Sequence, residues 1–258
     1  DPVLLSRRAP SSFASNRYNL PTERDSFFGR EAEMKQLREI LTSSDSRLVT
    51  LTGPGGSGKT RLATHLAREL IASFPDGVVF VELGSVHEVG EVMTAIGTAA
   101  GLPDRTLGTD SALRLAEQLN GRRLLIVVDN FEHVVDAAPS VAELIAHTHE
   151  LVLLITSREA LRLAGEKEVN IVPLELPRSG QREEVLASPA VQLLLDRASQ
   201  IGKTIPIDNN NVEKLQTIVN RLDGLPLALE LAVPLLRMRT VGELAERLPP
   251  STELLDSR

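Results

Sequence analysis

The chain lacks the residues that build disulfide frameworks, metal clusters and membrane spans. It has no cysteine among its 258 residues, so a disulfide framework is excluded and structural zinc is not expected. Its five histidines are scattered along the sequence and do not suggest a metal cluster. The longest unbroken apolar runs, such as residues 124–128, are five residues long. Runs of this length are typical of strands and are far too short to span a membrane.

An excess of positive charge is also missing. The 35 acidic and 28 basic residues give a net charge of −7. Because duplex binding needs a basic face, we expect this chain to bind no nucleic acid. The apolar share of 42% and the charged share of 24% are ordinary for a globular protein. The sequence begins with Asp1 and no signal-peptide pattern follows, so we interpret it as part of a longer cytoplasmic protein.

What the sequence does contain is a phosphate-binding loop. Residues 53–60 read GPGGSGKT, directly after an apolar run and directly before a helix-like segment. Glycines let successive backbone N–H groups point at a triphosphate. Lys59 supplies a positive charge near the β- and γ-phosphates, and Thr60 supplies a hydroxyl to Mg²⁺. The candidate nucleotide-binding residues of this segment are Gly53, Pro54, Gly55, Gly56, Ser57, Gly58, Lys59, Thr60 and Arg61.

A second chemical signal is the apolar run 124–128, which ends in Asp129. Because the carboxyl ends of parallel strands face the ligand crevice, we expect Asp129 beside Thr60 in the Mg²⁺ shell. The alternative is a solvated acid at a strand end. Asn130 stands where fast P-loop ATPases commonly place a second acid, and an amide cannot accept a proton from water. Glu132 is the nearest substitute, although a surface acid at a helix start is an equally good interpretation.

A third signal is the apolar run 151–156, which is followed by Ser157 and Arg158. An arginine there can reach a γ-phosphate and so distinguish ATP from ADP. An isolated strand-end arginine is usually a surface charge, but beside the two other motifs we interpret Arg158 as a nucleotide sensor. The candidate catalytic residues are therefore Lys59, Asp129, Glu132 and Arg158, and the candidate metal ligands are Thr60 and Asp129.

The order of apolar runs predicts the fold class. Strand-like runs occur at residues 48–52, 78–82, 124–128, 151–156 and 168–172. Helical patterns lie between them, and this alternation predicts an α/β fold with a parallel sheet covered by helices on both faces.

The character of the chain changes at residues 173–189, which are rich in proline, glycine and charge, and we place a domain boundary there. Helical patterns follow. Ser188 is a candidate cap, Thr240 and Glu243 form a predicted capping box, and Pro234 should kink or end its helix. The predicted organisation is a linker or arm over residues 1–18, a P-loop domain over 19–175 and a helical domain over 176–258.

Five segments, in this order and spacing, resemble the STAND class of signal-transduction ATPases: NLPTERDSFFGREAE, GPGGSGKTRLA, LLIVVDNFEH, LLITSRE and GLPLALELA. The similarity is strongest to bacterial AfsR and cyclase/LuxR-type regulators, which are related to MalT and to the NB-ARC ATPases. It covers roughly residues 19–248.

The resemblance implies an AAA-like strand order, with nucleotide between the sheet domain and the helical domain. It implies that Arg158 is the sensor-1 arginine and that Pro226, in the GLPL motif at residues 224–227, packs on the base. It also implies that the chain stops before a winged-helix domain. The residues implied to border adenine and ribose are Asn19, Leu20, Pro21, Phe27, Phe28, Gly29 and Arg30.

We therefore predict an ATP/ADP-dependent switch that hydrolyses ATP slowly, with ATP/ADP and Mg²⁺ as ligands, inside a multidomain bacterial transcriptional regulator. Its predicted partners are effector and sensor domains of the same polypeptide, and this class also admits a nucleotide-dependent homo-oligomer. One alternative is an AAA-type motor, which would need a second acid and an arginine finger, and Asn130 counts against it. Another is a P-loop kinase, which would need an acceptor pocket and an arginine-rich lid.

Overall fold

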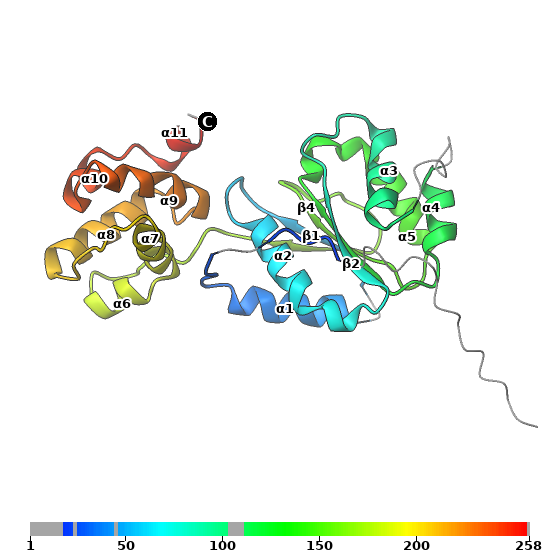
Figure 1. The fold of residues 1–258 in the computed structure, drawn as a ribbon, viewed down its shortest axis with the longest axis horizontal. Helices are drawn as coiled ribbons and strands as arrows, with labels where there is room; N and C mark the ends of the chain where they lie inside the picture. The colour runs from blue at the N-terminus through cyan, green and yellow to red at the C-terminus, as the bar shows by residue number, and fades with distance from the viewer. Residues whose placement is uncertain (1–17, 23–24, 44–45, 103–110, 257–258) are drawn as a thin grey trace, which may run out of the picture.

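The computed structural model describes residues 18–22, 25–43, 46–102 and 111–256 (Figure 1). The predicted arm over residues 1–18 lies outside these ranges except for Tyr18, whose backbone forms a parallel bridge with Val78. In the described ranges, no helix has the length and apolar character needed to cross a membrane.

A five-stranded sheet forms the centre of the molecule. Its strands are β1 Leu48–Thr52, β2 Gly77–Glu82, β3 Leu124–Asp129, β4 Val152–Thr156 and β5 Glu166–Asn170. All pair in parallel, in the order β2-β3-β4-β1-β5. The predicted parallel α/β sheet is thus confirmed. Strands β1, β3 and β4 are buried at every position, as their continuous apolar runs indicate.

The fifth strand differs from its predicted bounds of 168–172, because it runs over Glu166–Asn170. It is an edge strand whose residues are mostly exposed, so polar side chains are tolerated along it. The apolar run that located the other strands is therefore missing here, and the sequence pattern placed the strand two residues too late.

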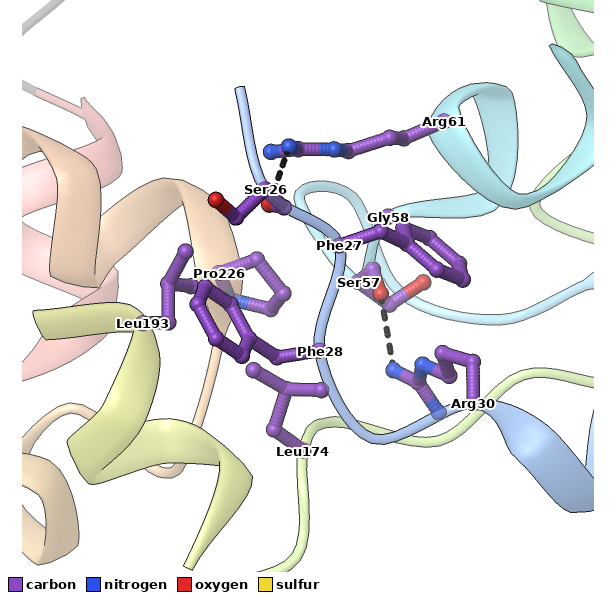
Figure 2. Close-up of a pocket in the computed structure, with 10 residues that line it drawn as sticks. All are labelled: Ser26, Phe27, Phe28, Arg30, Ser57, Gly58, Arg61, Leu174, Leu193 and Pro226. Atoms are coloured by element: carbon purple, nitrogen blue, oxygen red, sulfur yellow. Dashed lines mark hydrogen bonds between the residues drawn. The ribbon is translucent and has the colours of Figure 1, made fainter. Parts of the chain in front are cut away.

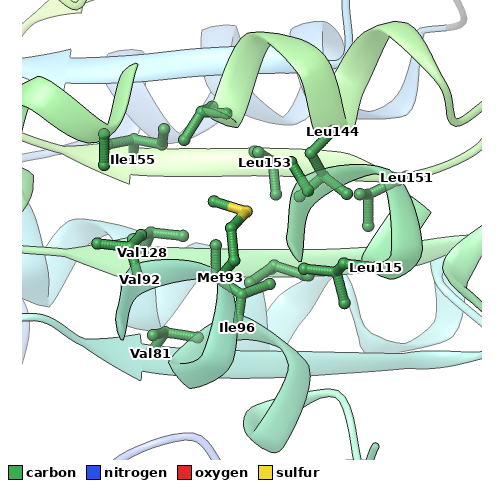
Figure 3. Close-up of a cluster of buried hydrophobic side chains, with 14 of the residues drawn as sticks. Val81, Val92, Met93, Ile96, Leu115, Val128, Leu144, Leu151, Leu153 and Ile155 are labelled. Carbon is green, nitrogen blue, oxygen red and sulfur yellow. The ribbon is translucent and has the colours of Figure 1, made fainter. Parts of the chain in front are cut away.

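Helices cover both faces of the sheet. One face carries α1 Glu31–Thr42 and α2 Lys59–Glu69, and the other carries α3 Val89–Ala99, α4 Ser111–Leu119 and α5 Ala138–Ala146 (Figure 1). Side chains of β3 alternate between the two cores: Leu125 and Val127 join the first, and Ile126 and Val128 join the second. Figure 3 shows the second core, in which Met93 lies between strand and helix side chains. Short 3₁₀ turns occupy Ile71–Ser73, Phe131–His133 and Val135–Ala137.

After the sheet, the described chain is helical. We call Arg182–Asp256 the helical part: α6 Arg182–Ala187, α7 Pro189–Gln200, α8 Asn209–Arg221, α9 Pro226–Ala232, the 3₁₀ turn Val233–Arg237, α10 Val241–Arg247 and α11 Ser251–Asp256. It has a core of its own, which also includes Leu174. The capping box of Thr240 and Glu243 is present, and the α-helix ends before Pro234. Both predictions are confirmed.

Two local predictions need correction. Residues 173–189, where the domain boundary is predicted, contain α6, for which no helix was predicted because six residues are too short to show a helical period. Ser188 does precede α7, but its hydroxyl does not cap that helix. It donates instead to the carbonyl of Glu175 at 2.8 Å, which ties the start of α7 to the connecting segment.

Candidate nucleotide site

The phosphate loop lies between β1 and α2 and is closed in by other backbone segments. Gly53 has a φ of 141°, and a Cβ there would collide with the carbonyl oxygen of Ile171. Gly56 has a φ of 78°, and a Cβ there would lie 2.9 Å from the Cβ of Leu227. These two glycines are therefore needed for packing inside the protein, in addition to the close approach to phosphate that the motif predicts.

Lys59 lies at the mouth of this loop. Its Nζ donates to the carbonyls of Gly53 at 2.8 Å and Pro54 at 3.0 Å. Burial lowers the pKa of Lys59 below its ordinary value, and the nearby Glu132 carboxylate opposes that shift. Ser57 adds a buried hydroxyl that has no hydrogen-bond partner among the described residues. The loop thus presents a partly desolvated cation and an unsatisfied hydroxyl, and both fit an anionic ligand.

The predicted metal ligands lie side by side. Thr60 Oγ1 donates to Asp129 Oδ1 at 2.7 Å, and Thr156 Oγ1 donates to the same oxygen at 2.5 Å. Burial raises the pKa of the Asp129 carboxyl, while the hydrogen bonds from Thr156 and Thr60 lower it. A carboxylate and a hydroxyl are oxygen ligands of the kind that Mg²⁺ prefers, so the residues fit that ion.

Glu132 and Arg158 also meet at this end of the sheet. Arg158 Nε lies 3.3 Å from Glu132 Oε1, and the Arg158 side chain is 65% exposed. Oε2 of Glu132 is buried and has no partner among the described residues. The exposed guanidinium of Arg158 is therefore accessible to a ligand, and one carboxylate oxygen of Glu132 still lacks a hydrogen-bond donor among the described residues.

Asn130 has a local structural reason to be an asparagine. Its φ of 62° lies in the left-handed region, where asparagine is tolerated better than most residues. Its backbone N–H donates to Thr156 Oγ1 at 3.1 Å, and the 3₁₀ turn Phe131–His133 follows directly. Asn130 therefore helps to form the turn that positions the Glu132 side chain.

Lys59, Thr60, Asn130, Glu132 and Arg158 line one cavity of about 800 Å³, and Asp129 adjoins it through its hydrogen bond with Thr60. Its walls come from the phosphate loop, from the ends of β3 and β4, and from the helical part, including Leu225, Pro226, Leu227, Glu230, Thr252 and Leu255. The backbone N–H of Leu227 donates to the carbonyl of Gly56 at 3.2 Å. The helical part therefore contacts the phosphate loop directly, and a cavity of this size is typical of small-molecule sites.

A second, apolar pocket adjoins the first (Figure 2). Phe28, Leu174, Leu193 and Pro226 meet in it, and Gly58, Arg61 and Pro226 line both cavities. Its free volume of about 30 Å³ holds little more than one water molecule. A purine ring therefore enters only if these walls separate.

Arg30 lies at the edge of this pocket but serves mainly to hold backbone. It is 4% exposed, and its guanidinium donates to the carbonyls of Ser57 at 3.1 Å and Val172 at 2.7 Å (Figure 2 shows the first). It also pairs with Glu33 at 2.7 Å. Arg30 thus fastens the phosphate loop to the segment that leaves β5.

The other residues that the resemblance places beside adenine and ribose fall into two groups, one away from both cavities and one at or near the apolar pocket. The Asn19 side chain hydrogen-bonds with the backbone of Phe80 in β2, Leu20 packs into the α1–α2 core, and the Pro21 carbonyl accepts from Arg68 of α2. In this conformation these three line neither cavity. Phe28 lines the apolar pocket, whereas Gly29 packs against Pro189 at the start of α7. The roles of all these residues toward a nucleotide stay predictions.

Comparison with known proteins fits this geometry. The family model described as an AAA domain matches residues 42–172, just over half of the chain. The chain belongs to the AAA domain family. This match spans the phosphate loop, Asp129 and Arg158.

Two relatives show where such AAA domains occur. A Mycobacterium tuberculosis protein provisionally named as an HTH-type transcriptional regulator is 38% identical over 220 residues, covering 85% of this chain and 23% of that protein. The regulatory protein AfsR of Streptomyces coelicolor is 28% identical over 257 residues, covering 92% of this chain and 24% of AfsR. The resemblance to AfsR-type regulators is confirmed, and the chain spans about a quarter of the length of these relatives.

A solved structure supports the fold. The ORC2 protein of Aeropyrum pernix, in ADPNP and ADP complexes, matches with a TM-score of 0.56 at 16% identity. The match covers 95% of this chain and 70% of that one, so the likeness extends beyond the AAA domain into the helical part.

Two groups beside the cavity were not predicted from the sequence. Thr156 was read only as the end of a strand, although its position beside Asp129 follows once β4 is paired with β3. Glu230 accepts from Arg61 at 3.3 Å and from Arg197 at 3.1 Å. Arg61 and Glu230 lie in segments that the sequence singles out, but nothing in the sequence predicts that they meet Arg197, because charged residues on helices usually belong to solvated faces.

Proposed function

We propose that this AAA domain binds ATP or ADP together with Mg²⁺ and acts as a conformational switch of the STAND type. The observation that carries the proposal is the shared cavity. Lys59, Thr60 and the sensor candidate Arg158 line it together with residues of the helical part, and the metal-ligand candidate Asp129 accepts a hydrogen bond from Thr60. A ligand that fills it touches both parts, so its chemical state can bias their relative arrangement.

The residues supply distinct roles in this proposal. The backbone N–H groups of the phosphate loop and the Lys59 ammonium bind the β- and γ-phosphates. Thr60 and Asp129 hold Mg²⁺, which when bound neutralises phosphate charge. Pro226 and Phe28 flank the base once the apolar pocket widens. Adenine nucleotide also occurs in the ORC2 complexes named above, which supports the ligand class.

Arg158 reads the γ-phosphate. In the described conformation its guanidinium pairs with Glu132, and its exposed position leaves room to turn toward a phosphate in the cavity. With ATP bound, Arg158 exchanges Glu132 for the γ-phosphate. With ADP bound, the pair with Glu132 reforms. A switch of this kind needs a difference in affinity between the two states, and the arginine provides it.

Replacing Arg158 with alanine is expected to remove most of the preference for a nucleotide that carries a γ-phosphate. A charge-assisted hydrogen bond contributes about 1.5–3 kcal/mol, so the ratio of ATP to ADP affinity should fall by about one to two decades. Calorimetric titration of both nucleotides into the wild type and the variant measures this ratio. Arg114→Ala, on the exposed side of α4, is the matched control. An unchanged ratio in Arg158→Ala would refute the sensing role.

We propose further that the domain works inside a larger regulator whose other domains carry the output. Two relatives are named as regulators and are about four times as long as the matched region. Nucleotide-dependent association of copies is compatible with this role. The main rival is a motor ATPase with steady turnover, and the rate of phosphate release distinguishes the two.

Contacts with DNA should come from outside this chain. Its net charge is −7, so it lacks the excess of cations that releases counterions from a duplex. Fluorescence anisotropy with a random duplex at low salt should therefore show no saturation at micromolar protein. Submicromolar binding that weakens steeply with added salt would contradict this expectation.

A further inference from the structure

Glu230 is an unexpected residue in a cavity for polyphosphate. It lies on α9, one helical turn after Pro226, and it lines the large cavity together with Lys59 and Arg61. A carboxylate repels phosphate, so it does not serve phosphate binding directly. Its natural ligands are hydrogen-bond donors, because an ionised carboxylate only accepts.

Two arginines from different parts of the chain hold this carboxylate. Arg61 of α2 reaches Glu230 Oε1 at 3.3 Å, and Arg197 of α7 reaches the same oxygen at 3.1 Å. Arg61 is itself fixed, because its other terminal nitrogen donates to the carbonyls of Asp25 at 2.9 Å and Ser26 at 2.6 Å (Figure 2 shows the second). The carboxylate is therefore oriented from the sheet side and from the helical part at once.

Arg197 strengthens this arrangement because it is buried. Its side chain is 8% exposed, it also pairs with Asp196, and its remaining terminal nitrogen is buried without a partner among the described residues. Glu230 Oε1 is thus engaged twice, while the described part of the chain provides no hydrogen bond to Oε2.

The position of Glu230 lies where the two cavities join. Arg61 and Pro226 line both the apolar pocket and the large cavity. Glu230 forms an ion pair with Arg61 and lies one helical turn after Pro226. A nucleotide with its base in the apolar pocket and its phosphates on Lys59 must carry its ribose past this junction. Ribose hydroxyls are hydrogen-bond donors, and a carboxylate is the acceptor that dinucleotide-binding folds also use for them.

We propose that Glu230 is a specificity-determining residue that accepts hydrogen bonds from the ribose hydroxyls of the bound nucleotide. Arg61 and Arg197 position it, so the site selects ribonucleotides over their deoxy counterparts. This inference rests on the proposed binding of adenine nucleotide. It also gives a role toward the sugar to Glu230, which lies in the GLPLALELA segment but for which the sequence predicted no role.

Calorimetric titration of ATP, 2′-deoxy-ATP and 3′-deoxy-ATP, each with Mg²⁺, tests the proposal. The wild type is expected to bind at least one deoxy nucleotide about tenfold more weakly than ATP. In Glu230→Gln, which keeps the shape but replaces the charged acceptor with a neutral amide oxygen, ATP affinity should fall toward that of the deoxy nucleotide, so the ratio shrinks. Glu213→Gln, an exposed carboxylate of α8, should keep the wild-type ratio.

The outcomes separate this inference from the proposed function. If the wild type binds ATP but does not discriminate between the three nucleotides, or if Glu230→Gln keeps the full preference, the ribose role is overturned while nucleotide binding stands. If the wild type binds none of them, both proposals fall. Glu230→Ala, checked for folding by thermal unfolding, provides a second variant in which no acceptor remains, and its preference should be lost completely.

Discussion

Replacing Lys59 with alanine is expected to reduce ATP affinity by about one to two decades. Lys59 is 8% exposed as a residue, and its ammonium is held over the loop by the carbonyls of Gly53 and Pro54. A triphosphate would replace these neutral acceptors with charged ones. A hydrogen bond to a charged group contributes about 1.5–3 kcal/mol, and every 1.4 kcal/mol changes affinity about tenfold.

Calorimetric titration with MgATP measures the effect of Lys59→Ala. Lys35→Ala, on the exposed side of α1, is the control for a general loss of positive charge. Thermal unfolding of both variants without nucleotide checks that the loop variant remains folded. Equal ATP affinity of the wild type and Lys59→Ala would exclude the loop as the phosphate site.

Replacing Asp129 with alanine is expected to abolish ATP hydrolysis, which should already be slow in the wild type. Asp129 accepts hydrogen bonds from Thr60 and Thr156, and in the proposal it holds the ion that neutralises charge in the transition state. Asn130 provides no base for the attacking water, and Glu132 is paired with Arg158. Wild-type turnover should therefore lie below the common enzyme range of about 1 to 10³ per second.

Phosphate release at saturating MgATP measures this prediction. Glu132→Ala should retain part of the activity, and Asp136→Ala, an exposed acid of the neighbouring turn, should retain all of it. Because alanine at 129 leaves two hydroxyls without their acceptor, Asp129→Asn serves as a variant that disturbs the fold less. Release at tens of molecules per second, or unchanged release in Asp129→Ala, would show that the metal site or the slow switch was misjudged.

The structure also changes the expectation for a gain of activity at position 130. From the sequence, Asn130→Glu is the obvious way to supply a second acid. The left-handed backbone at this position disfavours glutamate by about 1–2 kcal/mol, and the turn it begins also orients Glu132. Any added acid would therefore disturb the residue that it is meant to assist.

Much of the fold was predictable because burial leaves a clear pattern. Strands β1, β3 and β4 are buried on both faces, and such strands read as unbroken apolar runs. The phosphate loop and the capping box were predictable because their backbone geometry restricts which residues can stand there. Strand β5 and helix α6 were less predictable, since one is an exposed edge and the other is a single short helix.

The site was predictable only for residues that belong to a motif, because a motif specifies both the type of residue and its place in the chain. Thr60 and Asp129 were expected to meet, and they lie within hydrogen-bond distance. Arg30 and Glu230 illustrate the limit, because their roles depend on partners 142 and 169 residues away in the sequence. Arg30 reaches Val172 because β5 pairs with β1, and Glu230 reaches Arg61 because the helical part packs against the start of α2. No local sequence pattern encodes either arrangement.

The hydrogen bond between Leu227 and Gly56 joins backbone to backbone, which has a consequence for evolution. A link made from main-chain atoms survives almost any exchange of side chains, except the arrival of proline at 227 or of a Cβ at 56. Most of the surrounding side chains can therefore change without breaking this link between the helical part and the loop. In the proposed switch, this backbone link would keep the helical part joined to the phosphate loop while the side chains around it are replaced.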